Sequence, residues 1–216
     1  MIAQVFGLDI ELVMSESATK ERIQTMKAYG AKVTLTPAKK GILGARDYAE
    51  AKVKDKGYYM FNQFGNNDNW KAHYKTTGPE IWRDTDGKIT HFVSAMGTTG
   101  TIMGTSTFLK EQNTNIQIIG AQPTDGSKIP GIRKWPTEYL PKIFDRSKVD
   151  TILEVSEQEA RVMSNRLAKE EGIFCGMSSG GSVATALKLA ESLDEGLLVA
   201  IICDRGDRYL SSDLFE

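Results

Sequence analysis

The residues Ser94-Ala95-Met96-Gly97-Thr98-Thr99-Gly100-Thr101 combine two glycines with three threonines, and this composition suits a loop that holds a phosphate. The apolar segment 91–93 before them predicts a strand, and the pattern that opens at Thr101 predicts a helix. Glycines permit a sharp turn, and the N-terminal end of a helix attracts anions. Such turns also occur without a ligand. The spacing differs from the G-x-G-x-x-G and P-loop patterns, which argues against a nucleotide.

Two further groups of polar residues stand at element boundaries. Small residues and serines fill 176–182, just before a helical pattern, so hydroxyls would lie where that helix begins. Cys203 and Asp204 follow the apolar strand predicted at 197–202, and parallel sheets bind ligands at the carboxyl ends of their strands. An ordinary helix cap and a buried thiol are the simpler explanations of these two groups.

Strand and helix patterns alternate along most of the chain, which indicates an α/β fold with parallel sheets. We expect strands at 10–14, 32–36, 91–93, 116–121, 151–155 and 197–202. Helices are expected at 17–29, 44–56, near 79–82, at 101–111, after the capping box 156–159 and after 182. The polar stretch 65–69 separates two series of elements. Residues 1–7 read either as the last turns of an apolar helix that has no N-cap or as a short N-terminal helix that begins a domain.

The composition excludes several classes of function. Lys and Arg number 27 against 28 Asp and Glu, so no field strong enough to attract nucleic acid or anionic lipid is evident. The longest apolar run is too short to span a bilayer, and no leader is recognisable. Two cysteines and two histidines indicate neither a disulfide framework nor a metal cluster. We therefore expect a cytoplasmic protein that binds neither membranes nor nucleic acids.

Taken together, these motifs resemble the fold type II (β-family) pyridoxal-phosphate enzymes, and among them the cysteine synthases, or O-acetylserine sulfhydrylases. The matching segments are Asn62-Gln63-Phe64, Thr77-Gly78-Pro79-Glu80-Ile81-Trp82, Gly97-Thr98-Thr99-Gly100-Thr101, Ile129-Pro130-Gly131-Ile132 and Gly172-Ile173-Phe174-Cys175-Gly176-Met177-Ser178-Ser179-Gly180. Segments 130–136 and 201–211 favour the B-type branch. The resemblance implies a tryptophan synthase β-like fold with two Rossmann-like subdomains. Residues 1–64 would be the remainder of the smaller, substrate-side domain, and 65–216 the larger domain that binds the cofactor phosphate.

The resemblance also implies roles for particular residues. Cofactor binding falls to Gly97, Thr98, Thr99, Gly100, Thr101 and Ser178, with Ser178 facing the pyridine nitrogen of pyridoxal 5'-phosphate. Substrate binding falls to Gln63, Gly131 and Arg133, and Cys203 and Asp204 are expected near the cofactor ring. The implied reaction replaces the acetate of O-acetyl-L-serine with sulfide, or with thiosulfate, to give L-cysteine. Lys134 stands where a second arginine is expected, and lysine lacks the bidentate fork of arginine. A homodimer is expected.

The family motif that carries the Schiff-base lysine, Pro-Gly-Gly-Ser-x-Lys-Asp-Arg, does not occur in residues 1–216, nor does the Thr-Ser-Gly-Asn-Thr-Gly loop. We therefore expect a chain that lacks roughly the family's N-terminal third, has no catalytic lysine and is inactive by itself. The alternative is a non-catalytic partner or decoy of a full-length enzyme. Cystathionine β-synthase and threonine deaminase are rival enzymes, and segment 133–135 argues against both.

Overall fold

The computed structural model describes the backbone of residues 1–216 and the side chains of all of them except 55 and 56. The chain forms two compact units, residues 1–61 with 207–216 and residues 62–206. The domain division expected from the sequence was at residue 64, with the whole C-terminus in the larger domain. Residues 207–216 instead group with the first unit, because the Thr19 hydroxyl donates to the carbonyl of Arg208 at 2.6 Å and Ser211 donates to Glu21 at 2.7 Å.

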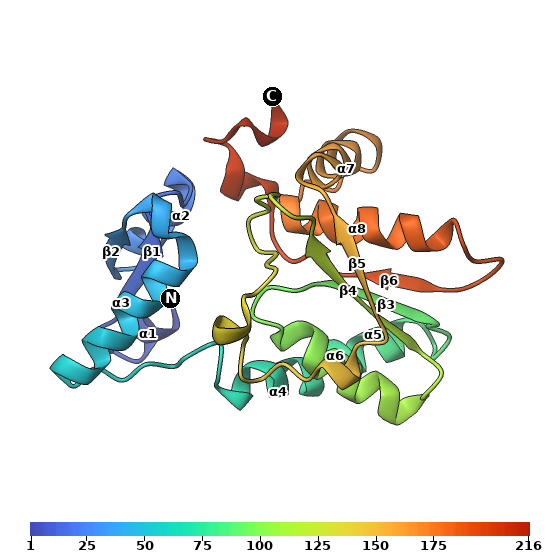
Figure 1. Ribbon diagram of the computed structural model, residues 1–216, viewed down its shortest axis with the longest axis horizontal. Helices are drawn as coiled ribbons and strands as arrows, with labels where there is room; N and C mark the ends of the chain where they lie inside the picture. Colours follow the sequence, from blue (N-terminus) through green and yellow to red (C-terminus); the bar gives the residue numbers. More distant parts are fainter. The chain divides into compact units, whose positions relative to one another are not determined.

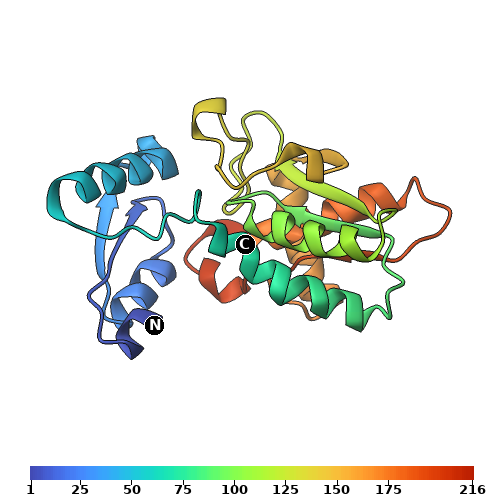
Figure 2. The same cartoon turned by 90° about the horizontal axis from the view of Figure 1, so that it is seen from below.

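The first unit contains a two-stranded parallel sheet, β1 (Glu11–Ser15) and β2 (Lys32–Thr36), with Glu11 opposite Lys32. Helix α3 (Gly41–Lys56) lies on one side of the strands and α2 (Lys20–Ala28) on the other, as Figure 2 shows. A short helix, α1 (Ile2–Val5), precedes them. Gly30 and Gly57 follow α2 and α3 with φ of +76° and +66°. These left-handed conformations end the helices where the sequence predicts.

A buried carboxylate links the elements of the first unit. Glu11 on β1 accepts hydrogen bonds from Lys52 of α3 at 2.6 Å and from Thr34 of β2 at 2.7 Å. These hydrogen bonds, with the neighbouring charge of Lys32, lower the pKa of Glu11 to about 2. Burying a charge is unfavourable unless it is paired, so this cluster is stable only while Glu11 and Lys52 are both ionised.

The second unit is built on a four-stranded parallel sheet in the order β5-β4-β3-β6 (Figure 1). Its strands are β3 (His91–Ala95), β4 (Gln117–Pro123), β5 (Thr151–Val155) and β6 (Leu198–Ala200). Helices α4 (Asn67–Lys75), α5 (Thr77–Asp84) and α6 (Gly100–Gln112) cover one face. Helices α7 (Glu157–Glu170) and α8 (Met177–Ala190) cover the other. The predicted parallel α/β class is confirmed.

Successive side chains of the central strands point to opposite faces of the sheet, so both faces carry apolar side chains. Phe92 and Ile118 belong to the core under α6, whereas Val93 and Ile119 pack on the α8 side. All four side chains are almost completely buried. Strands covered on both faces read as continuous apolar runs, which is how the sequence identified β3 and β4.

Two elements differ from the sequence-based expectation. Helix α4 begins inside the polar stretch 65–69, because the side chain of Asn66 accepts from the backbone N–H of Asp68 at 2.9 Å and caps the helix. Strand β6 is shorter than the predicted segment 197–202. The capping box Ser156–Glu159 at the start of α7 is confirmed. Within the described part of the chain, no helix is long and apolar enough to cross a membrane.

Candidate functional site

The loop 97–101 joins the end of β3 to the start of α6, as the sequence predicts. Thr99 precedes the helix in a left-handed conformation, with φ of +70°. The side chain of Thr99, the N-cap residue, makes no capping hydrogen bond in the described structure. The first N–H groups of an α-helix have no acceptor within the helix, so this end of α6 offers donors to an external acceptor. The positive end of the helix dipole favours an anion there.

Three threonine hydroxyls lie at this helix end, and they differ in their hydrogen-bond partners. The Thr98 oxygen accepts from the Asn69 amide at 3.2 Å and from the Gly100 backbone N–H at 3.3 Å. The Thr101 hydroxyl lies 3.2 Å from Nε2 of His73, whose pKa is lowered by burial. The Thr99 side chain is only 4% exposed, and its hydroxyl has no hydrogen-bond partner in the described structure. A buried polar group without a partner is unfavourable, so Thr99 marks a position where a ligand would add a contact.

Glycines allow three segments to meet beside this loop. A Cβ at Gly97 would lie 2.5 Å from the carbonyl oxygen of Gly131, and a Cβ at Gly131 would lie 2.9 Å from Oγ of Ser178. Ser178 is buried at the start of α8, and its Oγ lies 3.1 Å from Sγ of Cys203. The structure therefore brings together four residues that the sequence placed at one site.

Cys203 and Asp204 both contact the start of α8. The backbone N–H of Cys203 donates to the Ser179 hydroxyl at 3.0 Å, and the same hydroxyl donates to Asp204 at 3.3 Å. Cys203 is exposed, so the simpler explanation of Cys203 as a buried thiol is wrong, and the buried cysteine is Cys175. Burial raises the pKa of the Cys175 thiol to about 11. Of the two thiols, Cys203 is the one exposed to reagents in solution.

The two predicted substrate-side polar residues are placed differently. The Gln63 side chain is exposed, while its carbonyl oxygen accepts from the Asn69 amide at 2.6 Å. The guanidinium of Arg133 donates to the carbonyl oxygens of Ile129 at 3.0 Å and Ile132 at 2.7 Å. These bonds hold Arg133 within its own loop. Its role toward an anionic sulfur donor stays a prediction.

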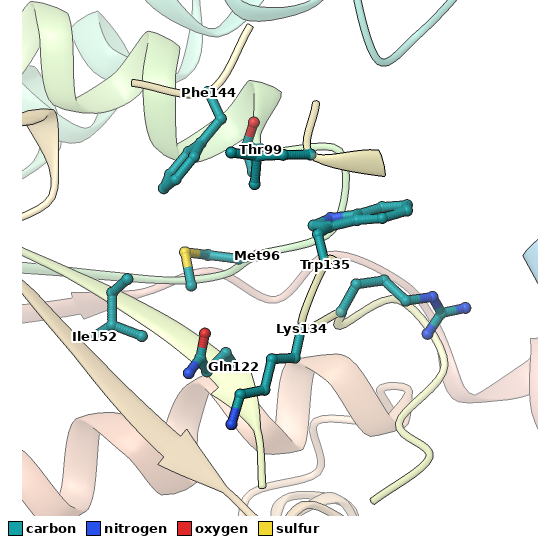
Figure 3. Close-up of a pocket in the computed structure, with 9 residues that line it drawn as sticks. Met96, Thr99, Gln122, Lys134, Trp135, Phe144 and Ile152 are labelled. Carbon is teal, nitrogen blue, oxygen red and sulfur yellow. The ribbon is translucent and has the colours of Figure 1, made fainter. Parts of the chain in front are cut away.

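A small cavity of about 90 Å³ lies beside the loop (Figure 3). It is lined by Met96, Thr99, Gln122, Arg133, Lys134, Trp135, Leu140, Phe144 and Ile152. The Trp135 indole N–H donates to the carbonyl of Gly97 at 2.7 Å. The Lys134 ammonium lies 2.7 Å from Asp125 and 2.9 Å from Glu154, and these carboxylates raise the pKa of Lys134. The positive charge of Lys134 is thus compensated by two negative ones.

The sequence reasoning missed Asn69, His73 and Trp135 as contacts of the loop. Asn69 belongs to an asparagine-rich stretch that reads as a break between elements, and a single histidine such as His73 indicates structural support more often than catalysis. The heptapeptide from Asn69 to Lys75 does contain the Trp70 and Tyr74 spacing of a helix face. That signal could have located α4, although not the residue that its first turn presents to the loop.

Comparison with known proteins connects this geometry to one family. Residues 1–204 match the family described as pyridoxal-phosphate dependent enzyme. The whole chain is 54% identical to cysteine synthase B of Pseudomonas aeruginosa and 52% identical to that of Escherichia coli, spanning 72% and 71% of those proteins. The solved structure of a cysteine synthase from Entamoeba histolytica superposes with a TM-score of 0.88 at 37% identity, over 99% of this chain and 66% of that one. The resemblance inferred from the sequence motifs is confirmed.

Proposed function

The chain belongs to the pyridoxal-phosphate dependent enzymes, and from this premise we propose that Gly97, Thr98, Thr99, Gly100 and Thr101 bind the phosphate of pyridoxal 5'-phosphate while Ser178 lies at its pyridine nitrogen. The observation that carries the proposal is the start of α6, where the N-cap residue Thr99 makes no capping hydrogen bond and its buried hydroxyl has no partner in the described structure. A phosphate dianion requires several short N–H and O–H donors, and this loop concentrates them.

The residues present fit the phosphate group. The Thr99 hydroxyl is buried and lacks a partner within the described structure. Gly100 has no room for a side chain, because a Cβ there would lie 1.9 Å from the Asn69 oxygen. The loop therefore supports a ligand that contacts backbone and hydroxyl groups at close range, as a phosphate at a helix N-terminus does.

We infer that the reaction is that of the cysteine synthases, in which the acetate of O-acetyl-L-serine is replaced by sulfide or thiosulfate. When bound, the cofactor supplies an electron sink for charge that develops at the substrate α-carbon. The neutral hydroxyl of Ser178 would leave the pyridine nitrogen unprotonated. Gln63 and Gly131 would lie near the substrate carboxylate, Arg133 would attract the sulfur donor, and Cys203 and Asp204 would lie near the ring. The homodimer expected from the family belongs to this proposal.

The charges expected near the sulfur donor bear on whether the enzyme uses sulfide or thiosulfate. Because Lys134 is paired with Asp125 and Glu154, it contributes little net charge toward a dianionic donor. Arg133 would then be the main cation for such a donor, and we propose that sulfide is used better than thiosulfate. Replacing both carboxylates with amides, Asp125→Asn and Glu154→Gln, would free Lys134 and improve the use of thiosulfate in an active form of the enzyme.

A binding experiment on the 216-residue chain tests the proposal. We expect pyridoxal phosphate to bind reversibly and to be removed by dialysis, because no lysine of residues 1–216 lies in the family's Schiff-base motif. After borohydride reduction, mass spectrometry should then find no single lysine modified in stoichiometric amount. Adding O-acetylserine and sulfide should yield no cysteine.

A Thr101→Val variant tests the loop itself, since it removes one loop hydroxyl while keeping side-chain size, and pyridoxal without the phosphate is the control ligand. The variant should weaken binding of pyridoxal phosphate and leave the binding of pyridoxal unchanged. Stoichiometric labelling of one lysine together with cysteine formation would refute the expectation of inactivity. Equal binding of the phosphorylated and unphosphorylated forms would refute the phosphate site itself.

A further inference from the structure

Asn69, in the first turn of α4, lies between the phosphate loop and the residue expected to face the substrate. Its amide nitrogen donates to the Gln63 carbonyl oxygen at 2.6 Å and to the Thr98 oxygen at 3.2 Å. The NH₂ group of an asparagine has two hydrogens, so these two bonds use its full donor capacity. We propose that Asn69 is a positioning residue that orients the Thr98 hydroxyl to donate to the cofactor phosphate. This inference rests on the function proposed above.

The hydrogen bonds around Thr98 decide which way its hydroxyl hydrogen points. A hydroxyl has two acceptor lone pairs and one donor hydrogen. The Thr98 oxygen accepts from the Asn69 amide and, at 3.3 Å, from the Gly100 backbone N–H. With both lone pairs engaged, the hydroxyl can add a partner only by donating its hydrogen. A phosphate oxygen is an acceptor, so this arrangement prepares Thr98 for a phosphate.

The remaining atom of the Asn69 amide, its oxygen, lies beside Gly100. Its oxygen lies so close to Gly100 that a Cβ built there would be 1.9 Å away. The backbone N–H of Asn69 donates to the Asn66 carbonyl at 3.1 Å, which holds the residue at the start of α4. Asn69 therefore contacts the loop at both Thr98 and Gly100. It links this loop to Gln63.

Aspartate at position 69 would reverse the direction of the bond to Thr98. An ionised carboxylate only accepts hydrogen bonds, so the Thr98 hydroxyl would donate to it and lose its hydrogen for the phosphate. The substitution also adds a negative charge, and the effect of that charge on phosphate binding has to be separated from the reversed hydrogen bond. Asn67, two residues earlier in the same turn, provides the control because its side-chain oxygen accepts from the Trp70 indole N–H at 3.1 Å. Asn67→Asp adds the same charge and retains its acceptor.

The test measures dissociation constants of the full 216-residue chain for pyridoxine 5'-phosphate and for pyridoxine. These probes carry no aldehyde, so lysine chemistry does not contribute. Asn69→Asp should raise the dissociation constant of the phosphorylated probe by at least about tenfold, the range expected for a lost hydrogen bond to a charged group. The dissociation constant for pyridoxine should stay unchanged. Asn67→Asp should have a much smaller effect on both probes.

Two further variants separate the hydroxyl from the fold. In a Thr98→Val background, Asn69→Asp should add little, since the hydroxyl that it misdirects is absent. Should N69D not fold by circular dichroism, Asn69→Ala takes its place, and its loss of affinity should again be confined to the phosphorylated probe.

Four results would overturn the inference. Equal effects of N69D and N67D would mean that charge alone acts. Equal losses for both probes would mean that Asn69 only supports the fold. A wild-type chain that does not prefer the phosphorylated probe would refute the proposed function, and the inference with it. A preference in the wild type that N69D leaves intact would refute the inference alone.

Discussion

At the scale of single residues, His73 connects the loop to the helices behind it. Its ring nitrogens lie 3.2 Å from the Thr101 hydroxyl and 2.9 Å from the Thr77 hydroxyl. Burial lowers the pKa of His73, so the folded state favours the neutral ring. As the pH falls through about 6.5, the unfolded chain takes up the proton first and the contribution of His73 to stability declines. Urea unfolding at pH 7.5 and 5.5 should show that the wild type loses more stability on acidification than His73→Gln does. Equal losses would contradict this role.

The same scale shows what the sequence could predict of the site. The structure brings Gly97, Gly131, Ser178 and Cys203 together, and each belongs to a motif of distinctive residue types. Asn69 could not be found in this way. An asparagine in a polar stretch is typical of a loop, and its role depends on where two hydrogens of one amide point. The pairing of Lys134 with Asp125 and Glu154 was equally invisible, because its partners lie on other segments.

At the scale of elements, α4 and α6 pack unusually closely at Gly104. A Cβ at this position would lie 2.0 Å from the backbone carbonyl of Trp70, which cannot move as a flexible side chain could. Gly104→Ala should therefore separate the helices and destabilise the protein by about 1–3 kcal/mol. Because the two helices carry Asn69 and the phosphate loop, it should also weaken phosphate binding. Gln112→Ala, an exposed position near the end of α6, is the control in urea unfolding. Stability equal to that of the control would contradict the packing argument.

The Glu11 cluster makes a prediction for the elements of the first unit. The pKa of Glu11 is about 2 in the folded chain against 4.5 as its ordinary value. Its contribution to stability is therefore present above pH 4.5 and is lost as the pH falls toward 2. Glu11→Gln should be less stable than wild type at pH 7, with the difference narrowing in acid. A difference that does not change with pH would exclude an ionic role.

Helices and strands were predictable where a sustained hydrophobic periodicity or a distinctive residue at the boundary marked them. The capping box before α7 and the glycines after α2 and α3 gave correct ends. Helix α4 was missed because its first turn consists of Asn and Asp, which favour caps and turns more than helix interiors. Its tertiary packing against α6, rather than its own propensity, accounts for the helix.

At the scale of the whole molecule, the two units have unequal cores. Among the residues whose burial is described, the first unit buries only Ala45, Tyr209 and Leu214 as apolar side chains, whereas the clusters around Phe92 and around Val93 belong to the second unit. The first unit should therefore unfold at lower urea concentration, which would violate two-state behaviour.

All three tryptophans, Trp70, Trp82 and Trp135, lie in the second unit. Tryptophan fluorescence should change at higher urea than the first transition in far-ultraviolet circular dichroism. Coincident curves would contradict the division.

The sequence could not predict this division fully. Residues 207–216 join the first unit through contacts with α2 that span most of the chain length, and no local pattern encodes such a pairing. The apolar side chains of Ile2, Val5 and Phe6 are exposed. Whether the chain self-associates through them stays a prediction.

The central claim is that residues 97–101 hold the cofactor phosphate. The most direct measurement is the change in backbone amide chemical shifts when the isotope-labelled chain is titrated with pyridoxine 5'-phosphate and, separately, with pyridoxine. We predict that the largest shifts fall on the amides of residues 97–101 and the following turn of α6, and only with the phosphorylated compound. Unchanged amides in this loop, or the same shifts with pyridoxine, would contradict the account.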